Sequence, residues 1–376
     1  MTLQRQVATF VSHYLEQWQP YRPFWNYEDG CIYKGLLDLA DASGSERFFE
    51  RAYQSVGART AQDGSLTGFD PDEFNIDNVN AGKALFWLLE RTGETRFRLA
   101  IDAQHAQLER HPRTRSGNYW HKKIYPNQVW LDGLYMAQPL RCAYARLTGR
   151  YEILNDVLAQ FENVRAAMRD DATGLYFHGW DESRAERWSN PRTGCSPCFW
   201  GRAMGWYVMA LVDCLELFAN APGGPSLNDG RVQLTALLAD ASDALMRVRS
   251  ANALWYQVLD QGSRAGNYEE SSATLMIAYA LMKGARLGVL NNALGEAGEE
   301  SFNACVARFV SPTELAGICS VAGLGNVPYR DGSYEYYLSE PVVANDPKGV
   351  GALMMAQAEG MRRVPEHLRA SHITDH

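Results

Sequence analysis

The chain has 376 residues, of which 46% are hydrophobic, so it is long and apolar enough to bury a substantial core. Its formal net charge of −8 argues against nucleic acid as the main partner, although a local basic pocket for a small anion is compatible with it. No apolar run reaches membrane-spanning length, and the first residues show no secretory signal. We therefore expect a cytoplasmic protein that forms one domain over residues 1–376 and binds neither nucleic acid nor membrane.

Apolar residues recur at the helical period along most of the chain. This period predicts twelve helices, with approximate spans of 3–19, 29–43, 45–60, 77–92, 94–110, 126–148, 150–169, 198–220, 228–248, 270–287, 291–310 and 347–363. Pro139 lies inside one of these spans and should kink that helix. Residues 221–226, rich in proline and glycine, are expected to form a surface connection.

Short turns of similar sequence join several of these helices in pairs. Residues 39–48 resemble residues 88–97, and residues 146–151 are a shorter copy. In each copy a helix ends at Gly44, Gly93 or Gly149, because glycine readily adopts the left-handed conformation of a helix C-terminal cap. Six helical hairpins predict an all-α fold, the (α/α)6 barrel. A helical solenoid is the alternative, but long and uneven loops favour a closed barrel with a site at one end.

The helices that follow the long loops are expected to form the inner ring of the barrel. They are rich in small residues, which permit close packing around a central axis. These small residues are Gly30, Gly35, Ala81, Gly82, Gly133, Gly201, Gly205, Ala273, Gly349 and Gly351.

Aromatic residues gather in six of the long loops, at 25–27, 67–69, 117–121, 175–180, 254–256 and 334–337. A pyranose ring offers an apolar C–H face to an aromatic ring and hydroxyl groups to nearby polar side chains. If the loops meet at one end of the barrel, their rings predict a sugar-binding cleft there.

Charged residues stand where the predicted inner helices begin: Asp77, Asp132, Arg202, Glu270 and Asp346. An acidic residue at a helix start can simply cap free N–H groups, which explains Asp346 as well as a catalytic role does. Capping explains Asp132 less well, because that residue lies several positions inside its predicted span, between Leu131 and Leu134. Asp132 is therefore a stronger candidate for a functional role than the other acidic residues, and Asp77 is a second candidate.

Basic and aromatic residues near these carboxylates are candidate substrate contacts. His121-Lys122-Lys123 is either a solvated basic loop or an anion site. His178 lies between aromatic residues in its loop, where it either packs or contacts a ligand. Trp200, Arg202 and Trp206 cannot all face one direction on a regular helix, but a frayed first turn would present all three.

The cysteines give no strong sign of a metal or redox site. Seven are present, an odd number found mostly in apolar helical segments, which is typical of buried thiols in a reducing compartment. Cys195 and Cys198 form a single CxxC pair without a second pair, which is a weak zinc or redox signal. We expect no metal and no cofactor.

Several of these segments carry a resemblance to a known family. Residues 121–136 contain Trp-Leu-Asp-Gly-Leu-Tyr-Met, and residues 200–206 read Trp-Gly-Arg-Ala-Met-Gly-Trp. Together with residues 77–82, 177–181 and 340–351, they resemble the unsaturated rhamnogalacturonyl hydrolases of glycoside hydrolase family 105, in order and over nearly the whole chain. The fold of that family is the (α/α)6 barrel, the fold that the helical pattern predicts independently.

The resemblance implies roles for named residues. Asp132 would be the general acid and base, and Asp77 would assist it. The residues implied to contact the substrate are His121, Lys122, His178, Trp200, Arg202, Trp206 and, by a less certain alignment, Tyr27.

The implied substrate is an oligosaccharide that carries a 4,5-unsaturated uronic acid at its non-reducing end. Protonation of its vinyl ether at C4 and addition of water at C5 would open the ring and release the neighbouring sugar. Three alternatives stay open: an unsaturated glucuronyl hydrolase, an (α/α)6 sugar isomerase with a histidine base, and a catalytically inactive sugar-binding protein. The sequence leaves the oligomeric state undecided.

Overall fold

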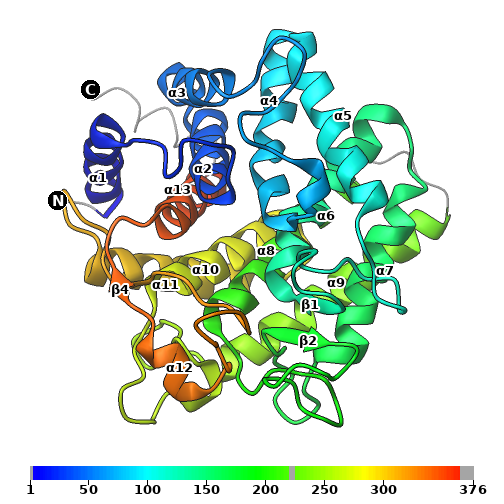
Figure 1. Ribbon diagram of the computed structural model, residues 1–376. Helices are drawn as coiled ribbons and strands as arrows, with labels where there is room; N and C mark the ends of the chain where they lie inside the picture. Colours follow the sequence, from blue (N-terminus) through cyan, green and yellow to red (C-terminus); the bar gives the residue numbers. More distant parts are fainter. Residues whose placement is uncertain (1–2, 220–224, 365–376) are drawn as a thin grey trace.

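The computed structural model describes residues 3–219 and 225–364, and helices dominate these residues (Figure 1). Six helices form an inner ring: α2 (Tyr27–Ser43), α4 (Lys83–Thr92), α6 (Leu131–Thr148), α8 (Gly201–Ala219), α10 (Ser271–Arg286) and α13 (Pro347–Arg363). Six more surround them: α1 (Leu3–Gln17), α3 (Glu46–Gly57), α5 (Thr95–Arg110), α7 (Ile153–Met168), α9 (Pro225–Arg247) and α11 (Asn292–Phe309).

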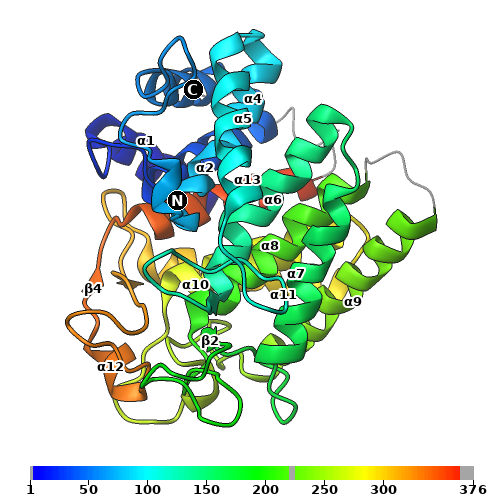
Figure 2. The ribbon, with the colours of Figure 1, turned by 45° about the vertical axis from the view of Figure 1, so that its right-hand side comes forward.

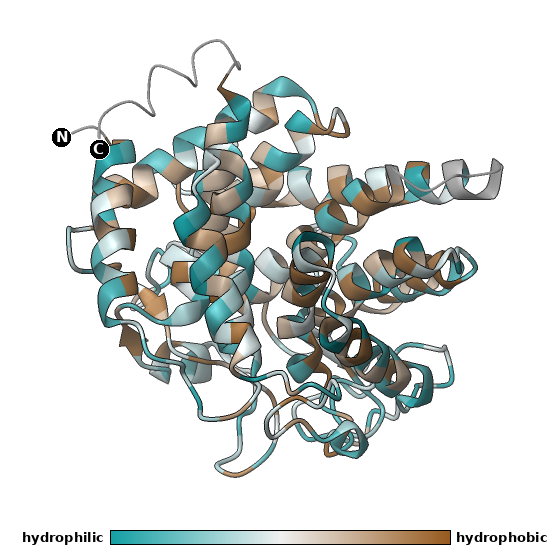
Figure 3. Cartoon of the chain, turned by 90° about the horizontal axis from the view of Figure 1, so that it is seen from above, coloured by the Kyte–Doolittle hydropathy of each residue, from teal (hydrophilic) through white to brown (hydrophobic). Residues whose placement is uncertain are grey.

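The inner helices contact one another in a closed cycle. Helix α2 packs on α4, and contacts then follow from α4 through α6, α8 and α10 to α13, which packs back on α2. Each outer helix packs against an inner one, as α3 does against α2 and α11 against α10. This closure confirms the predicted (α/α)6 barrel and excludes an open solenoid. Figure 2 shows the outer helices around the inner ring, and Figure 3 shows hydrophobic and hydrophilic positions alternating along the helices.

The predicted helices and short turns agree closely with the structure. Each of the twelve predicted spans overlaps one of these helices, with most ends within a few residues. Gly44, Gly93 and Gly149 have φ values of 69°, 70° and 74°, the left-handed conformation that the repeated turn requires. The amide N–H of Gly44 donates to the carbonyl of Ala40 at 2.8 Å, which caps α2.

Two helix starts were predicted wrongly, and one short helix was expected to be a loop. The span 126–148 begins as a helix only at Leu131, because Asn127 has a φ of 63° and strand β1 (Gln128–Trp130) follows it. That strand pairs antiparallel with β2 (Gly179–Asp181), a partner about 50 residues away along the chain. Residues 76–82 form the 3-10 helix η2 (Ile76–Gly82) before α4 begins, and the aromatic segment at 334 forms a short helix, α12 (Tyr334–Ser339).

Small residues bring the inner helices close together, as the sequence predicts. A Cβ atom on Gly351 of α13 would lie 2.5 Å from the carbonyl oxygen of Cys31 in α2. A Cβ atom on Gly30 of α2 would lie 2.7 Å from the Cα atom of Ala81 in η2. Both distances are shorter than side chains tolerate, so the glycines set the spacing of the ring.

The long loops gather at one end of the barrel, where the inner helices begin. Figure 1 shows β1, β2 and α12 in the lower half of the view, and Figure 2 shows β2 and α12 there too. A second small sheet pairs β3 (Ile318–Cys319) with β4 (Val342–Val343). Two short 3-10 helices also lie in the loops, η1 (Pro71–Glu73) and η3 (Leu259–Gln261).

Some of the aromatic loop residues support the fold instead of lining a cleft. Trp25, Tyr119 and Trp255 are buried in the core of the barrel. The connection expected at 221–226 lies mostly outside the described residues, and α9 begins at Pro225. No helix within 3–219 or 225–364 is both long and apolar enough to cross a membrane.

Candidate active site

A pocket opens at the end of the barrel where the inner helices begin, with a cavity of about 150 Å³. The loops before these helices and the first helical turns supply its walls. Eight of the nine residues singled out from the sequence line it: Tyr27, Asp77, His121, Lys122, Asp132, Trp200, Arg202 and Trp206. The ninth, His178, is fully buried beside Asp132.

The carboxylate of Asp77 is held by two basic side chains. The Nζ atom of Lys122 lies 2.7 Å from one oxygen of Asp77, and Nε2 of His121 lies 3.4 Å from the other. Burial opposes the charged form of Asp77, but Lys122 and His121 outweigh burial and hold the pKa of Asp77 well below its usual range. Asp77 is therefore ionised at neutral pH, and the charge of Lys122 is balanced within the protein.

Asp132, the second residue of α6, has a different environment. Its Oδ2 atom lies 3.3 Å from Nε2 of His178 without making a hydrogen bond, and no lysine or arginine in residues 3–219 or 225–364 lies within ion-pair distance of it. The other ring nitrogen of His178 shares a 2.7 Å hydrogen bond with the hydroxyl of Tyr337, which fixes the imidazole. The two pocket carboxylates thus differ in charge surroundings, one strongly paired and one not.

The local fold brings Trp200, Arg202 and Trp206 to the same pocket. Trp200 precedes α8 and is fixed by a bridge to Val258, while Arg202 and Trp206 lie one turn apart on α8. Because Trp200 lies outside the helix, it can face the pocket together with Arg202 and Trp206, which a regular helix over all three residues would not allow. The indole N–H of Trp200 donates to Gln257 at 3.1 Å, which orients the ring.

Arg202 is almost entirely enclosed by protein. Its Nε donates to Ser272 at 2.8 Å, and its guanidinium lies 3.4 Å from Glu270. It also donates to the backbone carbonyl of Cys319. Arg202 thus ties α8 to the start of α10 and to β3, as well as lining the pocket.

Comparisons with known proteins add to this geometry. A solved glycoside hydrolase from family 105 of C. acetobutylicum ATCC 824 is 38% identical, with a TM-score of 0.89, covering 94% of this chain and 98% of that one. Protein Atu3128 of Agrobacterium fabrum is 44% identical over 60% of this chain and 98% of its own length. The unsaturated rhamnogalacturonyl hydrolase YesR of Bacillus subtilis strain 168 is 27% identical, covering 70% of this chain and 72% of its own length.

The family model described as Glycosyl Hydrolase Family 88 matches residues 2–364. The chain belongs to the family 88/105 glycoside hydrolases. It is therefore a glycosidase that acts on an oligosaccharide, which disfavours the isomerase and the inactive binding protein as alternatives.

Two further residues suggested by the sequence have a structural place in this glycoside hydrolase. Glu270 caps α10 by accepting the N–H of Ala273 at 2.6 Å. Asp346 caps α13 by accepting the N–H of Lys348 at 3.0 Å. Both residues therefore cap helices, as expected for acidic residues at a helix start.

The cysteines of this glycoside hydrolase are free and buried, including Cys195 and Cys198. Among the residues that the structure describes, no group of three histidine, cysteine or acidic side chains is arranged to hold a metal ion.

Sequence reasoning missed several residues that line the pocket: Glu28, Tyr125, Trp130, Met136, Arg330 and Lys348. Lys348 pairs with Asp346 at 2.8 Å. Arg330 donates to the hydroxyl of Tyr125 at 3.1 Å, and within the described ranges no carboxylate lies within ion-pair distance of it. It lies in a loop about 200 residues from Lys122, so no local pattern could have identified it.

Proposed function

We propose that this glycosidase releases a 4,5-unsaturated galacturonic acid from the non-reducing end of rhamnogalacturonan-derived oligosaccharides. The observation that carries the proposal is the contrast between the two pocket carboxylates. Asp77 is held ionised by Lys122, whereas among the described residues His178 is the only basic side chain within ion-pair distance of Asp132. Two carboxylates in different surroundings are suited to different protonation roles. The name of the relative YesR supports the choice of substrate.

Asp132 is assigned the proton transfers. A 4,5-unsaturated uronic acid is a vinyl ether, because its C4=C5 bond is conjugated with the ring oxygen. Protonation of C4 by Asp132 forms an oxocarbenium ion at C5, and the resulting Asp132 carboxylate accepts a proton from the water that adds there. The hemiketal then opens and releases the neighbouring sugar. The ionised Asp77 supplies negative charge in the pocket while positive charge develops on the ring.

The remaining pocket residues are assigned to binding. Aromatic rings can pack on the sugar, and polar side chains can bind its hydroxyl and carboxylate groups. The assigned contacts are Tyr27, His121, Lys122, Trp200, Arg202 and Trp206, whereas His178, which the sequence also suggested as a contact, is fully buried and is assigned to positioning Asp132. We add Arg330 as a contact for the uronate carboxylate, because the charges of Lys122 and Arg202 are already matched by acidic partners.

The sugar that leaves is what separates galacturonyl from glucuronyl substrates. Galacturonic and glucuronic acids differ only in configuration at C4, and that centre becomes planar in the unsaturated ring. The terminal ring is therefore the same in both, so selectivity depends on the linkage at C1 and on the neighbouring sugar. In this pocket, Val321 and Arg330 come from the loop that precedes α12. That loop is the candidate contact for the neighbouring sugar.

Two experiments test the proposal. Incubation with a rhamnogalacturonan lyase digest should remove the absorbance of the unsaturated chromophore faster than incubation with a glycosaminoglycan lyase digest. Faster loss of absorbance with the glycosaminoglycan lyase digest would show that the proposed substrate is wrong, but it would not contradict the mechanism. In D₂O, early NMR spectra should show deuterium at C4 of the product derived from the unsaturated ring. Its absence would exclude vinyl-ether protonation and favour direct hydrolysis at C1.

A further inference from the structure

A second cavity lies at the other end of the barrel, where the inner helices run toward the short turns. Its volume is about 570 Å³, within the range of ligand pockets. Part of its wall is apolar, formed by Phe86 and Trp87 of α4, Pro139 of α6 and Leu217 of α8. Among the described residues it shares no lining residue with the substrate pocket.

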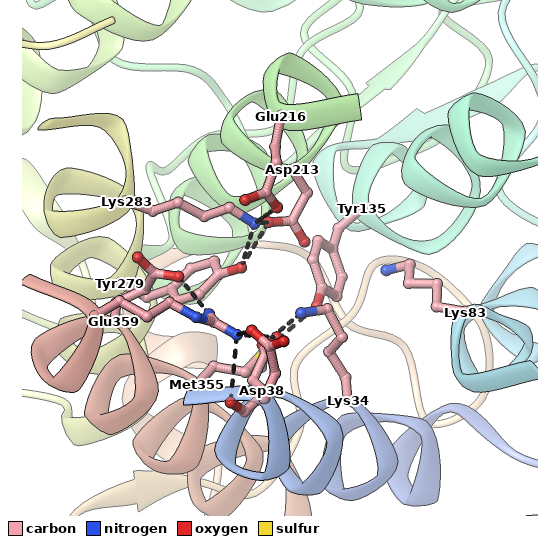
Figure 4. A network of polar contacts seen from close by, with 12 residues as sticks. Lys34, Asp38, Lys83, Tyr135, Asp213, Glu216, Tyr279, Lys283, Met355 and Glu359 are labelled. Atoms are coloured by element: carbon pink, nitrogen blue, oxygen red, sulfur yellow. Dashed lines mark hydrogen bonds and ion pairs between the residues drawn. The ribbon is translucent and has the colours of Figure 1, made fainter. Parts of the chain in front are cut away.

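The floor of this cavity is a network of charged side chains that point toward the barrel axis (Figure 4). Lys283 of α10 lies 2.6 Å from Asp213 and 2.8 Å from Glu216, both on α8. Lys34 of α2 pairs with Asp38 on the same helix. Most of the charge in the floor is therefore balanced by direct ion pairs.

Two polar groups in the floor are less completely satisfied: in the described part of the chain Lys83 has no ion pair, and one oxygen of the paired Asp213 has no hydrogen bond. Lys83 donates to Asn80 at 2.8 Å and lies 3.2 Å from the centre of the Tyr135 ring, but no carboxylate among the described residues is within ion-pair distance of it. The Oδ2 atom of Asp213 is buried without a hydrogen-bond partner in the protein. Burial lowers the pKa of Lys83 to about 7, which agrees with its unpaired state. A buried donor and a buried acceptor that face one cavity both favour a ligand that can satisfy them.

We propose that this cavity is a second ligand site, for a small neutral monosaccharide. A sugar hydroxyl can accept from Lys83, another can donate to Asp213, and the C–H face of the ring can pack against the half-buried Trp87. An anion fits less well, because the Asp213 carboxylate faces the same space and the neighbouring ammonium groups of Lys34 and Lys283 are already paired. The site is independent of the substrate proposed above.

A pair of aromatic rings lies between a residue that lines the substrate pocket and one that lines the second cavity. Trp206 lines the substrate pocket and stacks on Tyr135, with ring centres 4.8 Å apart. The Tyr135 ring also contacts Lys83, which lines the second cavity. A sugar in the second cavity would thus lie beyond these rings from Asp132, outside reach of the reacting atoms.

Titration with D-glucose, D-galactose and L-rhamnose, each followed by saturation-transfer NMR and calorimetry, tests the proposal. At least one of the three should bind the wild-type protein. Ala143→Phe, which fills the cavity, should weaken that binding at least tenfold, and Lys83→Met should also weaken it. The control Ala166→Phe, at an exposed position on α7, should bind as the wild type does. Thermal unfolding checks that each variant is folded.

Trp200→Ala separates the two pockets, because Trp200 lines only the substrate pocket. Binding that survives this change and is lost in Ala143→Phe supports the second site. Binding lost in Trp200→Ala and kept in Ala143→Phe would place the sugar in the substrate pocket and overturn the proposal. No binding of any of the three sugars to the wild type would overturn it too. If both Ala143→Phe and Lys83→Met fail to fold, a crystal of the wild type soaked with the sugar that binds shows directly which of the two cavities holds it.

Discussion

Replacing Asp132 by asparagine should abolish turnover while leaving the fold and substrate binding nearly unchanged. Asparagine keeps the shape of the side chain but has no acidic proton for C4. General acid–base catalysis contributes about 10²–10⁴-fold, which corresponds to about 3–5 kcal/mol of activation free energy. The stability cost should be small, about 1 kcal/mol or less, because Oδ2 of Asp132 makes no hydrogen bond and the side chain is 14% exposed.

Asp77→Asn is the matched comparison, because the same chemical change is made in a paired carboxylate. It removes the partner of Lys122, whose side chain is 23% exposed. Loss of one partner from a buried pair costs about 3–5 kcal/mol, and partial exposure reduces this to about 1–3 kcal/mol. Asp77→Asn should therefore lower both activity and thermal stability, whereas Asp132→Asn should lower activity alone.

The assay is loss of the unsaturated chromophore under single-turnover conditions, with the dissociation constant of the substrate and the unfolding temperature measured on the same samples. A variant Asp132→Asn that keeps more than about a tenth of the wild-type rate would refute the role of Asp132 as the acid. Equal destabilisation by the two variants would refute the inferred difference between their surroundings.

Three further predictions concern the pocket and the barrel. Lys122→Met should raise the pKa of Asp77, so the fall of kcat/KM at acid pH should begin at a higher pH than in the wild type. If the acid side of the pH profile does not move, ionised Asp77 is not required for the reaction. The pKa of Asp77 is lower in the folded state, so its ion pair stabilises the wild type above about pH 3.9, and the stability gap to this variant should narrow as the pH falls below that value. Arg330→Gln should weaken binding of a uronate-terminated fragment about tenfold or more, because a charge-assisted contact is worth about 1.5–3 kcal/mol. The same change should have little effect on binding of the methyl ester of that fragment. An equal loss of affinity for both ligands would assign Arg330 a structural role. Gly351→Ala should lower the free energy of unfolding by about 1–3 kcal/mol, because its Cβ would clash with the backbone of α2. Gly360→Ala on the same helix meets no atom within 4 Å and should raise the free energy of unfolding by about 0.5–1 kcal/mol. Chemical denaturation measures both changes, and similar values for the two variants would contradict the close packing at Gly351.

The sequence by itself determined the class of fold and most of the candidate site. Helical periodicity and the repeated cap glycines depend on interactions within a few residues, so they are readable along the chain. The hairpin order follows from them, and Gly44 and Gly93 adopt the conformation that the pattern required. Asp132 stood out because a carboxylate between Leu131 and Leu134, inside an apolar helical span, is explained less well by capping, and the family resemblance implied a role for both Asp132 and Asp77.

Only the tertiary structure decided how those residues are paired. The sequence left Lys122 as either part of a solvated basic loop or part of an anion site, yet it forms an ion pair with Asp77 of η2. Strand β1 forms because β2 lies beside it, so the start of α6 could not be read from local periodicity. Arg330 and the charged floor around Lys83 likewise join segments far apart in the chain. Such contacts depend on the closure of the helical ring, which places distant residues on one axis and has no counterpart in local sequence.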